Sequence, residues 1–463
     1  MVWRPAHLTV IRMKDKPTHT LPSFTGYLNK VFHFRDAIQQ LSDARQDPEI
    51  TPQSVFLAVF HSFLFRLPSF QQLEADLAQP QFQHRIGVER AFRDDVLRYS
   101  LCGFDLNGLQ RMLVAVNRRL KRNKAFDEGR VQGRIVAALD GIEVLSSYSR
   151  YCEACLRRRV KVNDDDGNPV ERIQYYHRAV GCQIVSSPAK PLLAVEWLQP
   201  GEGEDTAALR LLSQLPELYG SRFFDILLLD SLYAQAPALT LAEQIGWDLV
   251  ITLKQENREL YQSAMRLFQS RPPDQCFRQP QGHQGTEVEL WETDGLPFTQ
   301  DHPQPVRVLR SEEKVTEAHF RQGEHTLETT SRHWLWITTL EAPAFPAKTV
   351  WQLGHTRWKN ENNGWNDLTQ NWALKHGFLH ACKHRPKALS ASGQREPVPN
   401  HGLAAVTLIL CLAFALSSAF TLLHSKIFRL YHPRLIEVAR QLYRSLWQIQ
   451  PPARAPTNRS GGR

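Results

Sequence analysis

Three acidic residues stand at positions where a carboxylate could take part in chemistry. Asp140 ends one apolar run just before Gly141, and Asp230 ends another just before Ser231. We expect each aspartate to close a buried strand and to present its carboxylate at the edge of a sheet. A single aspartate of this kind is most often a turn residue that caps the next segment. Two of them, followed much later by Glu361, favour a set that acts together.

Carboxylates that converge repel one another, and their pKa values rise unless cations neutralise them. Mg²⁺ is a hard cation that prefers oxygen ligands of this type. Two such ions held close together can activate a water or a 3′-hydroxyl and stabilise the leaving oxygen of a phosphodiester. We therefore expect Asp140, Asp230 and Glu361 to bind two Mg²⁺ ions, with Mn²⁺ able to replace them. The chain has no glycine-rich phosphate loop that would indicate nucleotide chemistry instead.

Glu361 lies in the stretch HTRWKNENNGWNDLTQNW, residues 355–372. Arg357, Glu361, Trp365, Leu368 and Trp372 recur at helical spacing, which predicts a helix over 351–375 with these residues on one face. The simpler interpretation is an ion pair between Arg357 and Glu361, one turn apart. In the functional interpretation, Arg357 orients Glu361 or contacts a DNA phosphate, and the tryptophans pack the helix down.

The elements that must position these residues alternate between strand and helix. Apolar runs predict strands, and runs that end in glycine predict helices. In chain order, we expect strands at 135–145, 175–185 and 191–198, a helix at 205–220, a strand at 223–233, a helix at 236–246 and a strand at 248–254. This order predicts an α/β fold, with a mixed sheet flanked by helices.

The rest of the chain divides around this alternation. Residues 131–254 would form the first part of the core, 255–345 a β-rich insertion, and 346–450 the C-terminal part of the core. Residues 451–463 are expected to be disordered. Residues 1–130 would form an all-helical DNA-binding domain with a loosely packed lead-in at 1–50.

Within that domain, helices are expected at 51–67, 69–77, 93–101 and 105–126, although no clean helix-turn-helix signature is present. The last of these helices carries a basic run, from which we predict DNA contacts by Arg118, Arg119, Lys121, Arg122 and Lys124. The alternative for any one basic run is a solvated face. The whole chain has a formal charge of +9 and a pI near 9.2, which suits a polyanionic partner.

The cysteines indicate a reducing compartment. Seven of them are scattered along 463 residues, and we expect free thiols in a cytoplasmic protein. Cys152 and Cys155 have metal-ligand or redox spacing, but no second such pair follows. His177 and Cys182 could in principle complete a metal site, although incidental thiols are the favoured interpretation.

Residues 402–423 form an uncharged run long enough to span a bilayer. A helix buried in a large core is the favoured interpretation, and a membrane anchor is the alternative.

The blocks LDGIEVLSSYSRYCEACLRRR, LLLDSLYAQAP and GHTRWKNENNGWNDL, in this order, resemble the DDE transposases of bacterial insertion sequences, which have a ribonuclease-H-like core. The resemblance covers about 130–425. More narrowly, these blocks resemble the branch of the family that has a β-rich insertion and a Y-R-E-K-type signature. It implies that Asp140, Asp230 and Glu361 are the catalytic metal ligands, and that Arg357 and Trp358 contact DNA.

The resemblance has two departures. The tyrosine of the signature falls at Gly354, beside His355, and its lysine falls at Leu368. In the family, these two positions contact DNA near the cut. The expected metal ligands are not affected by either change. The resemblance also implies that the apolar helix at 402–423 packs against the sheet of the core.

The function implied is that of a bacterial cytoplasmic, nucleoid-associated transposase. It would bind double-stranded DNA, both the terminal repeats of its element and the target, and act as a homodimer with no membrane partner. It would catalyse Mg²⁺-dependent strand cleavage and strand transfer. The alternative is a catalytically inactive, transposase-derived protein that only binds DNA.

Overall fold

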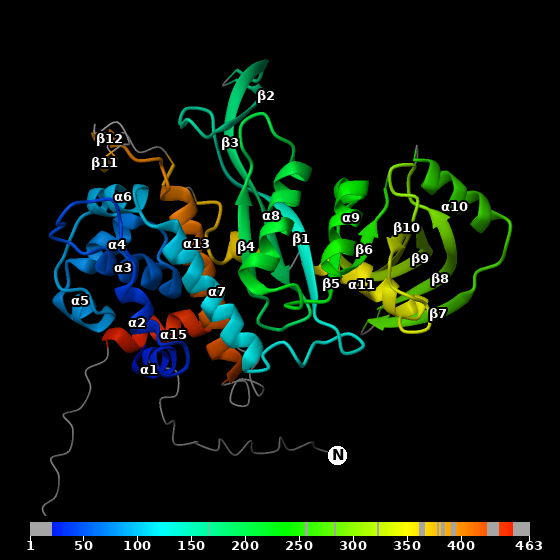
Figure 1. The fold of residues 1–463 in the computed structure, drawn as a ribbon, viewed down its shortest axis with the longest axis horizontal. Helices are drawn as coiled ribbons and strands as arrows, with labels where there is room; N and C mark the ends of the chain where they lie inside the picture. The colour runs from blue at the N-terminus through cyan, green and yellow to red at the C-terminus, as the bar shows by residue number, and fades with distance from the viewer. Residues whose placement is uncertain are drawn as a thin grey trace, which may run out of the picture.

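Five strands that contain apolar runs form part of a large mixed sheet, seen in the computed structural model in Figure 1. They are β1 (Val136–Ser147), β3 (Pro169–Ile184), β4 (Leu192–Trp197), β5 (Ile226–Leu229) and β6 (Asp248–Thr252). Their order across the sheet is β4-β3-β1-β5-β6. β3 is antiparallel to both β1 and β4, whereas β5 is parallel to both β1 and β6.

The parallel connections run through helices, as parallel strands require. α8 (Glu204–Tyr219) leads to β5, and the short 3-10 helix η1 (Ser231–Tyr233) and α9 (Ala236–Ile245) lead to β6. Gly246 ends α9 in the left-handed conformation, with φ of 86°. The predicted α/β class with a mixed sheet is confirmed.

The structure describes residues 21–164, 166–254, 258–281, 284–321, 324–360, 366–376, 379–380, 385–389, 395–423 and 435–447.

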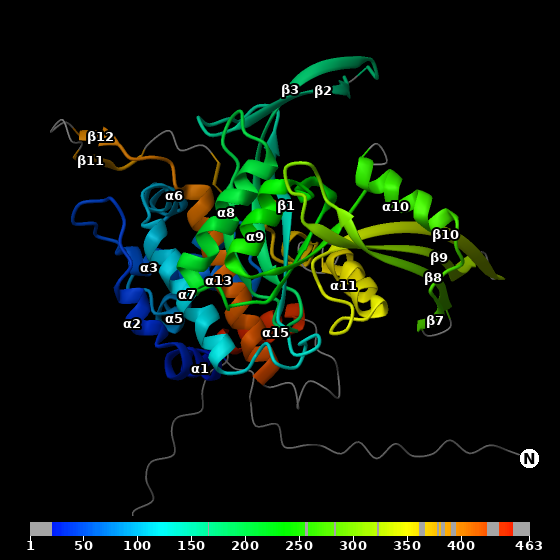
Figure 2. The same cartoon turned by 45° about the vertical axis from the view of Figure 1, so that its right-hand side comes forward.

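A strand that the sequence analysis missed, β2 (Leu156–Asn163), forms a long hairpin with the first half of β3. The hairpin projects beyond the other strands (Figures 1 and 2). Its residues alternate between charged and partly buried rather than forming an apolar run. A search for apolar strands therefore passes over it.

The predicted β-rich insertion does contain long strands, but they extend the same sheet. They are β7 (Gln275–Gln281), β8 (Gln284–Pro297), β9 (Pro305–Arg321) and β10 (Glu324–Thr338), preceded by a helix, α10 (Glu259–Gln269), that was not predicted. β10 pairs antiparallel with β6, through Trp336 opposite Thr252. Among the described residues, the sheet thus has ten strands.

Helices make up the N-terminal part of the chain. They are α1 (Leu21–Phe32), α2 (Phe34–Gln39), α3 (Pro52–Phe65), α4 (Phe70–Leu77), α5 (Pro80–Ile86), α6 (Asp94–Cys102) and α7 (Leu106–Arg122). Thr51 and Ser69 accept hydrogen bonds from the first turns of α3 and α4, as N-cap residues do.

The prediction of a loosely packed lead-in is wrong for the residues from 21 onward. Leu21, Phe24 and Leu28 of α1 are 2% exposed or less. Their spacing places them on one helix face, and the ring of Phe24 lies 5.1 Å from that of Phe420. The covering surface comes from the other end of the chain, so this packing could not be read locally.

The long apolar run forms α13 (Gly402–Leu423), which is followed by α15 (Leu435–Trp447). By length and composition α13 could cross a membrane, yet 89% of its most apolar stretch is buried inside the protein. The prediction of a buried helix is confirmed. Its main partners are α7, α3 and α6, rather than the sheet that the sequence analysis proposed. In Figure 1, α13 and α15 lie among the N-terminal helices.

The sheet has two differently covered faces near its centre. Val136, Ala138, Ile226 and Leu228 belong to one buried cluster, together with residues of α11 (Ala347–Asn360). Their neighbours in sequence, such as Ala137 and Leu227, belong to the larger cluster that includes α8. Because side chains alternate along a strand, α11 covers one face and α8 the other.

The predicted helix at 351–375 is only partly seen. α11 ends at Asn360 in the described chain, and α12 (Asn366–Gln370) ends before Trp372. The helix therefore does not continue to 375. Leu368 and Trp372 are each 1% exposed, so both pack inward as predicted. Two further short strands, β11 (Lys387–Leu389) and β12 (Arg395–Pro397), pair with each other.

Candidate active site

Asp140 on β1 and Asp230, directly after β5, occupy equivalent positions along two neighbouring parallel strands. The register pairs Val136 with Ile226 and Ala138 with Leu228, so each residue of β1 lies opposite the residue 90 positions later. Carried forward by two residues, this register aligns Asp140 with Asp230. Adjacent strands are about 4.8 Å apart, and the two aspartates each lie two residues beyond the last described pair of β1 and β5, Ala138 with Leu228.

The two aspartates reach this position in different ways. Asp230 directly follows β5, as predicted, and its side chain caps η1 by accepting a 2.6 Å hydrogen bond from the Ser231 amide. Asp140 does not end its strand, which corrects the prediction. β1 continues to Ser147 because β3 goes on pairing with it, with Asp140 opposite Gly181. What ends beside Asp140 is the described pairing of β1 with β5.

Both aspartates belong to the face of the sheet that α11 covers. Asp140 continues the alternation of Val136 and Ala138, and Asp230 continues that of Ile226 and Leu228. Arg357 of α11 confirms this for Asp230, because its Nη2 lies 3.8 Å from Asp230 Oδ1. Arg357 is 5% exposed, and the sequence analysis did not foresee Asp230 as its partner.

The Asp230 carboxyl lies in a positive environment. Burial alone would raise its pKa, but the Arg357 charge, the Ser231 amide and Lys254 together lower the pKa below its usual value. Lys254 Nζ lies 3.5 Å from Asp230 Oδ1. Asp230 is therefore held as an anion, ready to interact with cations.

A third acidic side chain approaches from the opposite face. Glu204, the first residue of α8, forms an ion pair with Arg178 and accepts a 2.7 Å hydrogen bond from the Tyr233 hydroxyl. Its carboxylate lies so close to Gly141 that a Cβ at that position would overlap it. Burial, with the charges of Glu204 and Asp140, raises the pKa of Tyr233. This glutamate was not singled out in the sequence, because only the fold places it next to Gly141.

Glu361, the third expected ligand, lies outside the described residues. The backbone of α11 is described as far as Asn360, and Glu361 is the next residue in the chain. The side chain of Trp358 also lies outside the described part. Their predicted roles therefore stay predictions.

A buried polar cluster fixes α11 against the extended part of the sheet. Glu313 of β9 is 4% exposed and contacts His355 Nε2 and Trp351 Nε1, each at 2.7 Å. A third contact of 2.7 Å comes from the Ser311 hydroxyl. These contacts set the position of α11, and with it that of Arg357.

Gly354 has a packing reason that the sequence did not reveal. A Cβ on this residue would overlap the indole of Trp336, which is 1% exposed in the centre of the sheet. The indole of Trp336 thus occupies the space where a tyrosine at position 354 would begin. Close packing between α11 and β10 therefore leaves no room for a side chain at position 354.

Several of the basic residues predicted to bind DNA make contacts inside the protein. Arg118 donates to the Leu218 carbonyl at 2.7 Å, and Arg119 donates to the Val31 carbonyl at 2.9 Å. Lys121 donates to the carbonyls of residues 222 and 223. These contacts join α7 to α1 and to the chain before β5. Arg122 and Lys124 are exposed. DNA binding by this helix stays a prediction.

The β2–β3 hairpin presents the other basic surface. Arg157 and Arg158 are exposed, and their guanidinium groups lie over the rings of Tyr175 and Tyr176 at 5.5 and 4.5 Å. Tyr151, which is 60% exposed, stacks on Tyr175. Exposed arginines among aromatic rings suit a nucleic-acid backbone and its bases.

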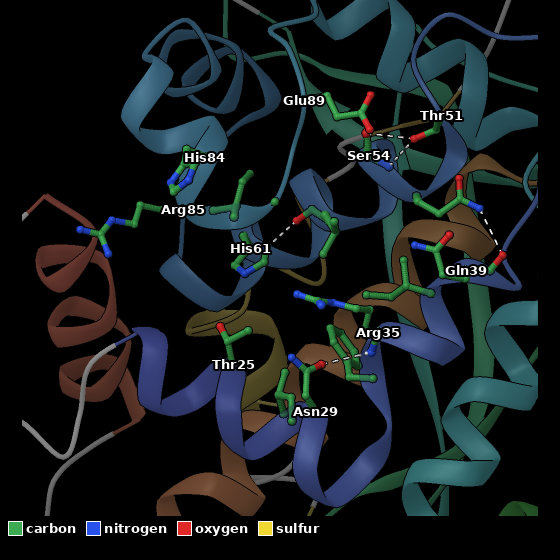
Figure 3. A pocket seen from close by; sticks show the side chains of 17 residues that line it. Thr25, Asn29, Arg35, Gln39, Thr51, Ser54, His61, His84, Arg85 and Glu89 are labelled. Atoms are coloured by element: carbon green, nitrogen blue, oxygen red, sulfur yellow. Dashed lines mark hydrogen bonds between the residues drawn. The ribbon is translucent and has the colours of Figure 1, made fainter.

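A pocket of about 400 Å³ lies in the helical part, among α1, α2, α3 and α5. Figure 3 shows Arg35, His61, His84 and Arg85 among the side chains that line it. Burial lowers the pKa of His61 to about 4, so this imidazole is neutral at ordinary pH. None of the carboxylates discussed above lines this pocket.

No family model matches the chain, and no curated protein matches it. Among solved structures, the chain is similar to a piggyBac transposase in a synaptic complex with hairpin DNA. The two chains are 10% identical, the alignment covers 92% of this chain and 80% of that chain, and the TM-score is 0.40. A likeness of this size assigns no residue of this chain a role.

Proposed function

We propose that the protein is a DNA transposase of the DDE type, which cleaves and joins DNA strands with the carboxylates of Asp140, Asp230 and Glu361. The observation that carries the proposal is the alignment of Asp140 with Asp230 on β1 and β5, on the face that α11 covers. Glu361, one residue beyond the described part of α11, would be the third member.

The two described carboxylates fit a site for divalent cations. The register of β1 and β5 aligns them, they share a face, and Arg357 and Lys254 keep Asp230 in the anionic form that a metal ion would bind. Bound there, two Mg²⁺ ions would supply an activated water or 3′-hydroxyl and charge stabilisation at the leaving oxygen. Asp140, Asp230 and Glu361 would hold them.

The other residues would position the DNA and the carboxylates. Arg357 keeps Asp230 ionised and oriented, and Lys254, whose side chain is 55% exposed, is available to a phosphate oxygen. The basic hairpin of β2 and β3 would contact the duplex outside the cut. The exposed part of the α7 basic run would add sequence-independent phosphate contacts.

The finer assignment follows from the sequence resemblance. We propose a ribonuclease-H-like core formed by β1, β3, β4, β5 and β6, supported by three antiparallel strands followed by two parallel ones. The proposed substrates are the terminal repeats of a bacterial insertion sequence and its target DNA, with a homodimer as the acting form and the bacterial cytoplasm as its location.

The test is a cleavage assay with the purified chain and DNA carrying the ends of its own element. With Mg²⁺ or Mn²⁺ we expect nicked and then joined products. With Ca²⁺ we expect binding without cleavage, because its looser coordination suits in-line displacement poorly. Binding without cleavage under every metal would instead support the inactive DNA-binding alternative.

A further inference from the structure

Two cysteines and two histidines converge at the base of the β2–β3 hairpin. Cys152 and Cys155 lie in the turn between β1 and β2, and His177 lies on β3. His380 comes from the segment between α12 and α13, 225 positions after Cys155. The four potential ligand atoms all lie within 4.8 Å of one another.

The individual distances are those of a four-ligand cluster. Cys152 Sγ and Cys155 Sγ are 3.7 Å apart. His177 Nε2 lies 3.2 Å from Cys152 Sγ and 3.4 Å from Cys155 Sγ, and His380 Nε2 lies 3.0 Å from Cys155 Sγ. Each histidine thus directs the same ring nitrogen toward the thiols.

These spacings fit a tetrahedral metal ion. With Zn–S bonds of about 2.3 Å and Zn–N bonds of about 2.0–2.1 Å, a regular tetrahedron separates two sulfurs by about 3.8 Å and a sulfur from a nitrogen by about 3.5 Å. The observed sulfur separation of 3.7 Å matches. The sulfur–nitrogen separations of 3.0 to 3.4 Å are slightly shorter than those of the regular tetrahedron.

The surroundings also suit a structural site. Cys155, His177 and His380 are buried, at 4%, 8% and 6% exposure, and Cys152 is half-buried. Both thiols are free, and their sulfurs are far beyond bonding distance. Sulfur and nitrogen ligands that face one another in a buried position are typical of a closed structural metal site.

We propose that Cys152, Cys155, His177 and His380 bind one structural Zn²⁺ ion. Four protein ligands close the coordination sphere, so the ion serves folding rather than catalysis. It fastens the segment that follows α12 to the base of the β2–β3 hairpin. The carboxylate site lies elsewhere on β1 and takes hard oxygen ligands, whereas this set of sulfur and nitrogen ligands selects zinc.

This inference corrects the favoured interpretation of the two cysteines as incidental thiols. The sequence analysis considered His177 and Cys182 as further ligands. Cys182 is buried but is not part of the cluster. His380 was missed because it lies far from the two cysteines in the sequence.

A separate correction concerns Cys102, which is disulfide-bonded rather than free.

The proposal is tested on the full-length chain, purified under reducing conditions without chelators, and no DNA is needed. We expect one zinc per chain by elemental analysis. Cobalt substitution should give the visible spectrum of a tetrahedral site with thiolate-to-metal charge transfer. Cys155→Ser and His380→Asn should each retain almost no zinc. Cys276→Ser and His333→Asn, at exposed positions outside the cluster, should bind as the parent does.

A second measurement does not depend on any variant folding. Stripping the parent protein with a strong chelator should lower its melting temperature, and added Zn²⁺ should restore it. A reduced parent protein that holds no zinc and gives no cobalt spectrum would overturn the proposal. So would a Cys155→Ser variant with the full metal content, or a Cys152–Cys155 disulfide in place of the ion.

Discussion

At the scale of single residues, Arg357 connects the buried helix α11 to the proposed catalytic carboxylates. Its guanidinium is 5% exposed and lies 3.8 Å from Asp230. Arg357→Ala removes the main charge that lowers the Asp230 pKa, so that pKa should rise. The free energy of unfolding should fall by about 1–3 kcal/mol, because Asp230 loses a buried partner. Thermal or denaturant unfolding measures the loss.

Arg90→Ala serves as the matched control. Arg90 pairs with Glu49 at 2.7 Å, but both side chains are largely exposed, so its removal should cost less than about 1 kcal/mol.

Arg357→Lys separates two roles of this residue, the ion pair with Asp230 and a contact with a DNA phosphate. Lysine keeps the charge, but it cannot make the forked contact of an arginine to a DNA phosphate. Loss of that contact should raise the activation free energy of strand transfer by about 1–3 kcal/mol. Equal stability losses at positions 357 and 90 would argue against the ion pair.

Gly354 gives a second prediction at this scale. Gly354→Ala should destabilise the protein by about 1–3 kcal/mol, because its Cβ would overlap the Trp336 indole in a packed interior. Gly26→Ala is the control, since it also lies in a helix and a Cβ there meets nothing within 4 Å. That change should be neutral or slightly stabilising. Similar melting temperatures for the two variants would contradict the packing account.

At the scale of elements, the attachment of α11 to β9 depends on the ionised form of Glu313. Burial would raise its pKa, but the contacts with His355, Trp351 and Ser311 together lower it. A carboxyl with a lowered pKa in the folded state stabilises the protein above its unfolded pKa of about 4.3. This stability is lost as the pH falls through the lower, folded pKa.

Glu313→Gln should therefore cost about 1–3 kcal/mol near neutral pH and flatten the loss of stability below about pH 4. Melting curves of the parent and the variant across the acid range measure both effects. Glu317, which is on the same strand and pairs with Arg332 only at the surface, gives the matched control as Glu317→Gln. An unchanged acid profile for the Glu313 variant would show that the cluster does not fix α11.

The elements also show what could be predicted from the sequence. β1 and β5 follow from apolar runs, because buried strands are locally encoded, but β1 continues past Asp140 because β3 goes on pairing with it. β2 lacks such a run, because many of its residues are charged, and it was therefore not predicted as a strand. The Arg357–Asp230 contact and the space around Gly354 depend on how α11 meets the sheet. His380 lies near Cys155 only because of the tertiary structure, and the residues are too far apart in sequence for a spacing rule to connect them.

At the scale of the whole molecule, the two ends of the chain share one helical core. Phe420 of α13 is 1% exposed and packs against Phe24 and Tyr27 of α1. Phe420→Ala should lower the free energy of unfolding by about 3–5 kcal/mol. Leu327→Ala, at a side chain that is 73% exposed, should have little effect.

Because α13 packs inside the protein, we also expect the chain to remain in solution after sedimentation of membranes.

The central claim is that Asp140 and Asp230, with Glu361, form one catalytic centre. Cleavage of end-bearing DNA in Mg²⁺ by Asp140→Asn, Asp230→Asn and Glu361→Gln, beside the parent chain, tests it most directly. Asp248→Asn, at the opposite end of the parallel strands, is the control. We predict that each of the first three variants binds the ends but cuts at least about 10³-fold more slowly, a loss of about 4 kcal/mol in transition-state stabilisation, and that the control cuts normally. Parental cleavage rates in any one of the three would contradict the assignment.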